Sequence, residues 1–330
     1  MIRTILIKLI LAISIANPRA GVIDKPVWPS PPADPKVEYV DEINCNELEL
    51  KTGFLGKLKR YIGGQSEMEK ISLPFDILAT EDRLYLTCQN IPYLIEVEIE
   101  TNSFKLYSDT DYPFVYPIAL CHAGGGTILI SDSEAATIFK FKNGRVKPFI
   151  TENLLRPTGI AALYEREAIY VVDTGDHSLK IFDYMGKFIK KIGGQSNDSS
   201  GFNFPTFALA NSGNAVFVND ALNYKIKRFD GDGNLEFSFG EEGNGPGTFS
   251  RPKGIAMDNE NHVYVVDNIF DNVQVFDKAG KLLLVIGSGG QSPGQFWSPA
   301  GIDIVDNTIY IADTFNNRVQ ILRYLEGGKR

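Results

Sequence analysis

Aspartate is the chemically active residue that recurs most regularly in this sequence. It ends an alternating apolar segment, as in IYVVD and IYIAD, at five positions 41 to 47 residues apart, namely Asp132, Asp173, Asp220, Asp267 and Asp313. Carboxylates bind cations and serve as acids and bases. However, a residue found in nearly every copy of a repeat is better explained by a structural need of each copy. A carboxylate at a strand end can accept N–H groups of the following turn, so we interpret these aspartates as structural.

The remaining metal-binding and nucleophilic residues do not form a familiar site. The chain has three histidines and three cysteines, at His122, His177, His262, Cys45, Cys88 and Cys121. Their spacing matches neither a zinc site nor a disulfide framework, although one disulfide stays open. The glycine-rich FGEEGNGPG lacks the strand, turn and helix context that a phosphate-binding loop needs. No cofactor is therefore predicted from these residues.

The elements that position these residues follow from internal repetition. A proline opens an apolar segment in each of six copies, at Pro74, Pro117, Pro157, Pro205, Pro252 and Pro299. Within a copy, short runs alternate apolar and polar residues between turn residues, as in GIAMD, VYVVD, VQVF and KLLLVIG. Four such strands make one propeller blade. The sequence therefore predicts an all-β, six-bladed propeller.

The two ends of the chain predict how the ring closes. The sixth copy stops after VQILRY and lacks a fourth strand, whereas GKLKRYIGGQS at 56–66 parallels GKFIKKIGGQS at 186–196, the fourth strand of copy three. We therefore predict that residues 56–66 pair with the last blade and remove its free edge. For residues 37–51 the sequence predicts either a further outer strand or no defined position in the sheet.

Several segments resemble NHL repeats. The resemblance rests on P-x-G-I-A, IYVVD, NNRVQIL, FGEEGNGPGTF and IGSGGQSPGQF, and it spans roughly residues 56–323. Copies one and two depart from the pattern, with Asp76 and Ala119 where better copies have Gly159, Gly254 and Gly301. With its N-terminal segment, the chain is similar to exported bacterial NHL-repeat proteins. That resemblance implies a six-bladed propeller with a binding or scaffolding role, and it names no partner.

The N-terminus predicts export from the cytoplasm. Residues 1–20 combine Arg3 with an apolar run and small residues, which is typical of a signal peptide or an N-terminal anchor. Residues 21–36 are predicted to be a proline-rich linker of extended polyproline conformation rather than a strand, with Trp28 either docked or exposed. Residues 37–330 are predicted to form one monomeric propeller domain. A periplasmic, cell-surface or secreted location follows, and no later segment is apolar enough to span a membrane.

The charge of the chain opposes nucleic-acid binding. The formal net charge is −8, and removal of residues 1–20, with Arg3, Lys8 and Arg19, would make it −11. A protein this acidic does not follow a phosphate backbone non-specifically. The expected partner is therefore a protein or a peptide.

We predict that function lies where the repeats differ. The loops between second and third strands vary and share the face around the channel mouth. Their predicted binding residues are Tyr93, His177, Asn223, Tyr224, Phe270, Asp271, Phe315, Asn316 and Arg318. Aromatic and arginine side chains are enriched in binding hot spots. The alternative is that they are ordinary loop residues packed against neighbouring blades.

Two further aspartates are predicted to face the central channel. Asp76 and Asp303 belong to the first strands of copies one and six, which are neighbours in a closed ring. Their oxygens suit Ca²⁺ or Mg²⁺, although solvated or lysine-paired acids are the plainer outcome. These residues support a second hypothesis, a channel-metal hydrolase or lyase resembling the lactonases and amidating lyases built on six-bladed propellers.

Overall fold

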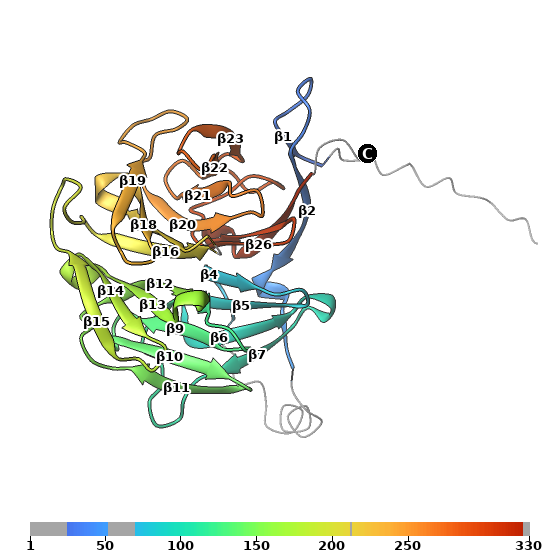
Figure 1. Cartoon of the computed structure of the whole chain (residues 1–330). Coiled ribbons are helices and arrows are strands. Elements are labelled where there is room, and N and C mark those ends of the chain that lie inside the picture. The colour runs from blue at the N-terminus through green and yellow to red at the C-terminus, as the bar shows by residue number, and fades with distance from the viewer. Residues whose placement is uncertain (1–24, 52–69, 212, 326–330) are drawn as a thin grey trace, which may run out of the picture.

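The computed structural model describes residues 25–51, 70–211 and 213–325, and over these ranges the chain is built from β-strands and short 3-10 turns, with no α-helix. Six sheets, antiparallel except for the β3–β7 pair, stand around a central channel (Figure 1). The predicted all-β, six-bladed propeller is confirmed. Within the same ranges, no helix is long and apolar enough to cross a membrane.

Blades two to five each consist of four consecutive strands, whereas blades one and six also include strands from the N-terminal segment. Blade one contains β4 (Pro74–Ala79), β5 (Arg83–Cys88), β6 (Ile91–Glu98) and β7 (Ser103–Tyr107), with β3 (Glu49–Leu50) added in parallel at its outer edge. Blade two contains β8 (Pro117–His122), β9 (Ile128–Asp132), β10 (Thr137–Lys142) and β11 (Arg145–Ile150). Blade three contains β12 (Pro157–Leu163), β13 (Ala168–Asp173), β14 (Ser178–Asp183) and β15 (Phe188–Gly193).

The remaining blades follow the same order. Blade four contains β16 (Pro205–Asn211), β17 (Ala215–Asp220), β18 (Lys225–Asp230) and β19 (Leu235–Phe239). Blade five contains β20 (Pro252–Met257), β21 (Val263–Asp267), β22 (Asn272–Phe276) and β23 (Leu282–Ile286). Blade six contains β24 (Ile302–Val305), β25 (Thr308–Asp313), β26 (Arg318–Tyr324), β2 (Val37–Asn44) and β1 (Val27–Trp28).

The proline and aspartate markers of the repeat lie opposite each other in the sheets. Pro157 pairs with Asp173 and Pro205 with Asp220, in each case just before a register shift. The start of each first strand and the end of each second strand are thus at one end of the blade. We call this end the loop face. It carries the loops between second and third strands and the segments that enter each blade before its proline, and the opposite face carries the other turns.

The ring closes with an N-terminal strand, but not with the predicted one. The strand paired with β26 is β2, in a register that places Val37 opposite Tyr324 and Ile43 opposite Val319; Figure 1 shows blue β2 beside red-brown β26. The other neighbour of β26 is β25, so the prediction that residues 56–66 close blade six is wrong. Those residues lie outside the described ranges. In β2 the buried residues Val37, Tyr39 and Ile43 alternate with half-buried ones, as a half-buried strand requires, apart from exposed Asp41 beside a register shift.

The proline-rich segment also contributes to the sheet. Val27 and Trp28 pair with Glu38 and Val37, so the prediction that this segment forms no strand is wrong at these two residues. The free edge of β2 offers unpaired N–H and C=O groups, and the segment around β1 pairs with its first residues, where the Tyr39 N–H donates to the Pro26 carbonyl at 2.9 Å. Trp28 is half-buried and packs against the core between blades five and six.

The glycine-rich stretches between blades are explained by one contact. Gly240 directly follows β19 and has a φ of +94°, and a Cβ atom there would lie 2.4 Å from the ring of Phe249. Phe249 is fully buried and bridges back to Glu242. A phenylalanine thus fills the space left by the glycine and fixes the segment that enters the next blade.

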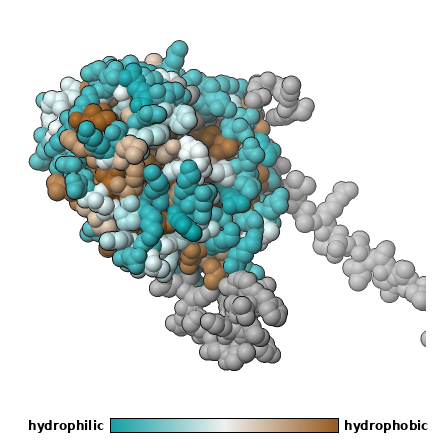
Figure 2. Space-filling model, turned by 60° about the horizontal axis from the view of Figure 1, so that its bottom comes forward, coloured by the Kyte–Doolittle hydropathy of each residue, from teal (hydrophilic) through white to brown (hydrophobic). Residues whose placement is uncertain are grey.

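On the outside, the face in Figure 2 is largely hydrophilic, with hydrophobic residues in separate patches.

Candidate functional site

The five repeated aspartates fix the loop face. The Asp173 carboxylate accepts hydrogen bonds from the backbone N–H groups of Leu155 and Arg156, both at 2.7 Å, and from that of Gly175 at 3.2 Å. One side chain thus joins the segment entering blade three to the loop after its second strand. Asp132 and Asp267 make the same kind of contacts in their own blades. This geometry accounts for the repetition without any catalytic role.

Three of these aspartates also pair with a buried cation from the third strand. Lys180 lies 2.6 Å from Asp173, and Lys227 lies 2.9 Å from Asp220. In blade six, Arg318 Nε lies 2.8 Å from Asp313. Because all five aspartates are fully buried and hydrogen-bonded, they are not available to a ligand.

Several predicted binding residues take part in this internal network. Arg318 is only 6% exposed and, besides Asp313, pairs with Glu42 of β2 at 2.7 Å. Asn223 donates to the Asp220 carboxylate at 2.8 Å, and Asn316 donates to the Asp313 carboxylate at 2.9 Å. These three side chains hold the loop face together.

Other predicted residues pack against neighbouring segments. The backbone N–H of Phe204 donates to His177 Nδ1 at 3.1 Å, and the two rings are 4.6 Å apart. Asp271 accepts the N–H of Ser298 at 2.6 Å, and burial raises the pKa of its carboxyl group above the ordinary value. Tyr93, Tyr224 and Phe270 are half-buried.

Phe315 is the predicted residue most available to a partner. It is 46% exposed and makes an edge contact, at 5.7 Å between centroids, with Trp297, which is 49% exposed. The pair belongs to a wider group. Of twelve exposed large hydrophobic residues in the described ranges, eight lie on the loop face: Tyr112, Val115, Leu155, Phe204, Leu222, Ile269, Trp297 and Phe315.

A cavity opens at the centre of the loop face, which we call the mouth pocket. It has a volume of about 260 Å³ and is lined by Phe75, Ile118, Ala119, Arg156, Thr158, Thr174, Phe204, Thr206, Phe207, Ala221, Leu222, Arg251, Pro252 and Lys253. Five of these residues directly follow the first-strand prolines of their blades. Phe75 of blade one and Phe207 of blade four stack at 5.8 Å, with 27° between their planes. The mouth pocket is therefore built jointly by opposite sides of the ring.

The charged residues of the mouth pocket are all cations. They are Arg156, Arg251 and Lys253, and within the described residues none of the three forms an ion pair. Lys253 Nζ lies 5.5 Å from the centroid of the Phe75 ring. Burial, with a smaller effect of Arg251, lowers the pKa of Lys253 to about 8. The pocket thus holds positive charge that no carboxylate of its own lining neutralises.

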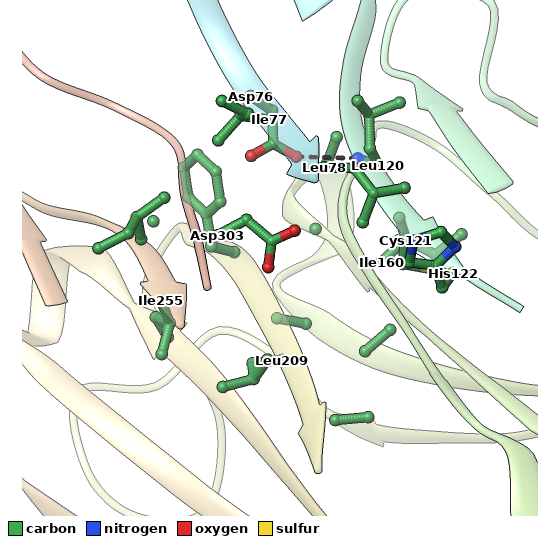
Figure 3. Close-up of a pocket in the computed structure, with 18 of the residues that line it drawn as sticks. Asp76, Ile77, Leu78, Leu120, Cys121, His122, Ile160, Leu209, Ile255 and Asp303 are labelled. Carbon is green, nitrogen blue, oxygen red and sulfur yellow. Dashed lines mark hydrogen bonds between the residues drawn. The ribbon is translucent and has the colours of Figure 1, made fainter. Parts of the chain in front are cut away.

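A second cavity continues along the axis, and we call it the channel cavity. It has a volume of about 220 Å³, and Phe207 lines it as well as the mouth pocket. Asp76 and Asp303 both line it, as the alternation of the first strands predicts, and Figure 3 shows their carboxylates facing the same space. A Cβ atom on Gly301 would lie 2.7 Å from Asp76, so this glycine permits the close approach of blades six and one.

Both channel carboxylates are anchored to neighbouring backbone. Asp76 accepts the N–H of Leu120 at 2.8 Å, and Asp303 accepts the N–H of Ala79 at 2.7 Å. Burial raises the pKa of Asp76 to about 7, with a smaller contribution from the charge of Asp303, and burial raises the pKa of Asp303 to about 6. No cluster of three or more metal-ligating side chains occurs among the described residues.

The mouth pocket is the feature that the sequence analysis missed. The predicted binding residues lie in the loops after the repeated aspartates, whereas Phe75 and Lys253 come directly after the repeated prolines. The available signal was the variation at that position, which is Phe75, Ile118, Thr158, Thr206, Lys253 and Ala300 in the six copies. Its meaning depends on the ring that brings these positions together.

Comparison with known families and curated proteins supports the repeat assignment over parts of the chain. A family model described as a six-bladed beta-propeller, DUF5128, matches residues 259–328. The mouse NHL-repeat-containing protein 4 is 31% identical over 81 residues. That alignment covers 24% of this chain and 57% of the mouse protein, so the chain spans little more than half of this relative.

Solved structures show the same fold at low sequence identity. Virginiamycin B lyase from Staphylococcus aureus has a TM-score of 0.58 and 17% identity, covering 78% of this chain and 97% of the lyase. An auxiliary nutrient binding protein from Bacteroides thetaiotaomicron has a TM-score of 0.64 and 13% identity, covering 78% of this chain and 70% of that protein. The fold is thus shared by an enzyme and by a binding protein.

Proposed function

We propose that this chain is a non-enzymatic binding or scaffolding propeller that works outside the cytoplasm and holds a protein or peptide partner on its loop face. The observation that carries the proposal is the distribution of exposed hydrophobic residues. Eight of the twelve large ones in the described ranges lie on the loop face, and two of these, Phe204 and Leu222, line the mouth pocket. Exposed apolar side chains gathered on one face are typical of interaction surfaces.

The framework of the loop face supports this role. The repeated aspartates tie each entering segment to a second-strand end, as Asp173 does with Leu155 and Arg156. Exposed residues such as Leu155 therefore stand on fixed backbone. A pre-organised surface loses little conformational entropy when a partner binds.

The proposal is tested by capture of a partner with matched variants. The immobilised chain is exposed to an extract of the source cells, and a loop-face variant carries Leu222→Ser, Trp297→Ala and Phe315→Ala. We expect this variant to lose at least tenfold of any specifically captured protein, because the side chains removed are exposed anchors on the proposed surface. Bound proteins are identified by mass spectrometry.

A control variant carries Tyr164→Ala and Met185→Ala, which remove exposed hydrophobic residues from the turn between β12 and β13 and from that between β14 and β15. These turns are on the opposite face, so capture should be unchanged. Equal capture by the two variants would contradict a loop-face site.

A channel-metal hydrolase or lyase is a second candidate, favoured by the two carboxylates that face the channel cavity. Asp76 and Asp303 supply oxygen ligands of the kind that Ca²⁺ and Mg²⁺ prefer, but Ca²⁺ takes about 6–8 ligands, so backbone carbonyls or waters would have to supply the others. Metal analysis of the purified protein and a screen of lactones and amides test this function. Turnover lost on Asp303→Asn supports it, and a metal-free protein without turnover opposes it.

A further inference from the structure

The mouth pocket combines positive charge with apolar walls. Arg156, Arg251 and Lys253 come from the start of blades three and five, and no carboxylate lines the pocket with them. The fully buried cations of the described structure are paired, as Lys180 is with Asp173 and Lys227 with Asp220. Lys253 is half-buried and Arg156 and Arg251 are exposed, so an anion that enters the pocket meets three cations for which no lining carboxylate competes.

The walls limit what that anion can be. Phe75 and Phe207 stack against each other, and Phe204 and Leu222 complete an apolar lining. The volume of about 260 Å³ exceeds the roughly 150 Å³ of a cavity that holds benzene. There is room for one aromatic or aliphatic side chain together with a carboxylate. A bare inorganic anion would leave the apolar walls without contacts.

We infer that the mouth pocket binds the C-terminal residue of the partner peptide, with its apolar side chain packed against the stacked phenylalanines and its terminal carboxylate beside Lys253, Arg156 and Arg251. This inference rests on the proposed function and names the part of the partner that the loop face recognises. A C-terminal residue carries its side chain and its carboxylate on one Cα atom, so a single residue satisfies both halves of the pocket. Capture of a terminal carboxylate is an established mode of peptide recognition.

The test uses three short peptides and calorimetric titration of the whole chain. The probes are N-acetyl-Gly-Ser-Gly-Phe with a free carboxylate, the same peptide as a C-terminal amide, and N-acetyl-Gly-Ser-Gly-Ala with a free carboxylate. We expect the free phenylalanine peptide to bind, and the other two to bind at least tenfold more weakly, because one lacks the charge and the other lacks the ring.

Two lysine variants locate the site. Lys253→Met keeps an unbranched apolar side chain and should lower the affinity for the free phenylalanine peptide at least tenfold. The matched control is Lys278→Met, an exposed lysine in the turn between β22 and β23 of the same blade on the opposite face, and it should leave the affinity unchanged. A thermal unfolding scan of each variant verifies that it is folded.

Two results would overturn the inference: equal binding of the acid and the amide, or full affinity in folded Lys253→Met protein. Failure of the proposed function is distinguishable from this. If the loop-face variant loses a captured partner while the peptides do not discriminate, only the C-terminal recognition is wrong. If the peptides bind as expected but the loop-face variant and the opposite-face control variant capture a partner equally, the proposed function is wrong, whereas the inferred chemistry of the pocket stands.

Discussion

The aspartates at the strand ends of the loop face differ in their surroundings from the aspartates in the channel. Asp220 at a strand end pairs with Lys227 and accepts backbone and side-chain hydrogen bonds. Asp303 in the channel accepts backbone hydrogen bonds but has no cationic partner, and burial raises its pKa to about 6. Three of the five strand-end aspartates thus have a cation of their own blade beside them, whereas neither channel aspartate does among the described residues.

The difference shows how a repeat protein separates structure from binding. Five of the six blades fix their entering segment with the repeated aspartate, and blade one has Cys88 at that position. Asp76 and Asp303 each occur in one copy of the repeat. Other blades have Gly159 and Gly254 at the position of Asp76. The cations of the mouth pocket are likewise confined to blades three and five. The charged groups of the channel and of the mouth pocket therefore occur where single copies depart from the repeat.

Replacement of a strand-end aspartate should have the largest effect. Asp220→Ala leaves Lys227, which is 2% exposed, without its carboxylate. Removal of one partner of a buried ion pair costs about 3–5 kcal/mol, and we expect a loss of this size in the free energy of unfolding. Denaturant titration measures it, with Asp303→Asn as the control that should not destabilise the protein. A loss below about 1 kcal/mol would contradict the structural role.

Replacement of both channel aspartates should have a smaller effect of opposite sign. Because the folded-state pKa values, about 7 for Asp76 and about 6 for Asp303, exceed the ordinary value, the folded chain holds more protons than the unfolded chain between roughly pH 4 and 7. These groups therefore lower stability as the pH rises through that range. Asp76→Asn with Asp303→Asn should remove this loss and stabilise the protein by at least about 1 kcal/mol at pH 7.5.

The measurement is thermal unfolding from pH 4.5 to 7.5 for the wild type and the double variant. The difference in Tm between them should grow as the pH rises. A constant difference would show that the channel carboxylates titrate at ordinary values, and the contrast with the strand-end aspartates would then disappear.

Added Ca²⁺ or Mg²⁺ should have the smallest effect. If the channel pair binds the ion, a concentration ten times the Kd stabilises the folded chain by about 1.4 kcal/mol, because ionised carboxylates are then neutralised. Thermal unfolding at pH 7.5 with and without millimolar Ca²⁺ measures this, and the double variant should show no shift. An equal shift in both proteins would place the ion elsewhere.

The blades could be predicted from the sequence because each obeys local rules that repeat. Pro157 and Asp173 recur as a pair since they lie opposite each other in one sheet, and Gly240 recurs with Phe249 since one fills the space beside the other. These local packing and pairing requirements explain why the same residues occur at the same spacing in successive copies. Pattern alone therefore predicted the number of blades and the axis-facing position of Asp76 and Asp303.

The features that could not be predicted depend on contacts between distant segments. Residues 56–66 look like a fourth strand, but the pairing of β26 with β2 is decided by burial of Val37, Tyr39 and Ile43 against the last blade. Arg318 was selected as a loop residue, whereas its partner Glu42 comes from the other end of the chain. Phe75 and Phe207 meet only across the completed ring. No local pattern encodes these juxtapositions.

The pairing of β2 with β26 also sets an order of events during synthesis. Residues 37–44 leave the ribosome long before residues 318–324 exist, and at about 5–20 residues per second the interval is roughly 15–60 s. Throughout that time the partly apolar strand β2 of the nascent chain has no partner strand, and the blades already synthesised cannot form a closed ring. Synthesis of residues 318–324 therefore allows an open, association-prone arc to become a closed ring.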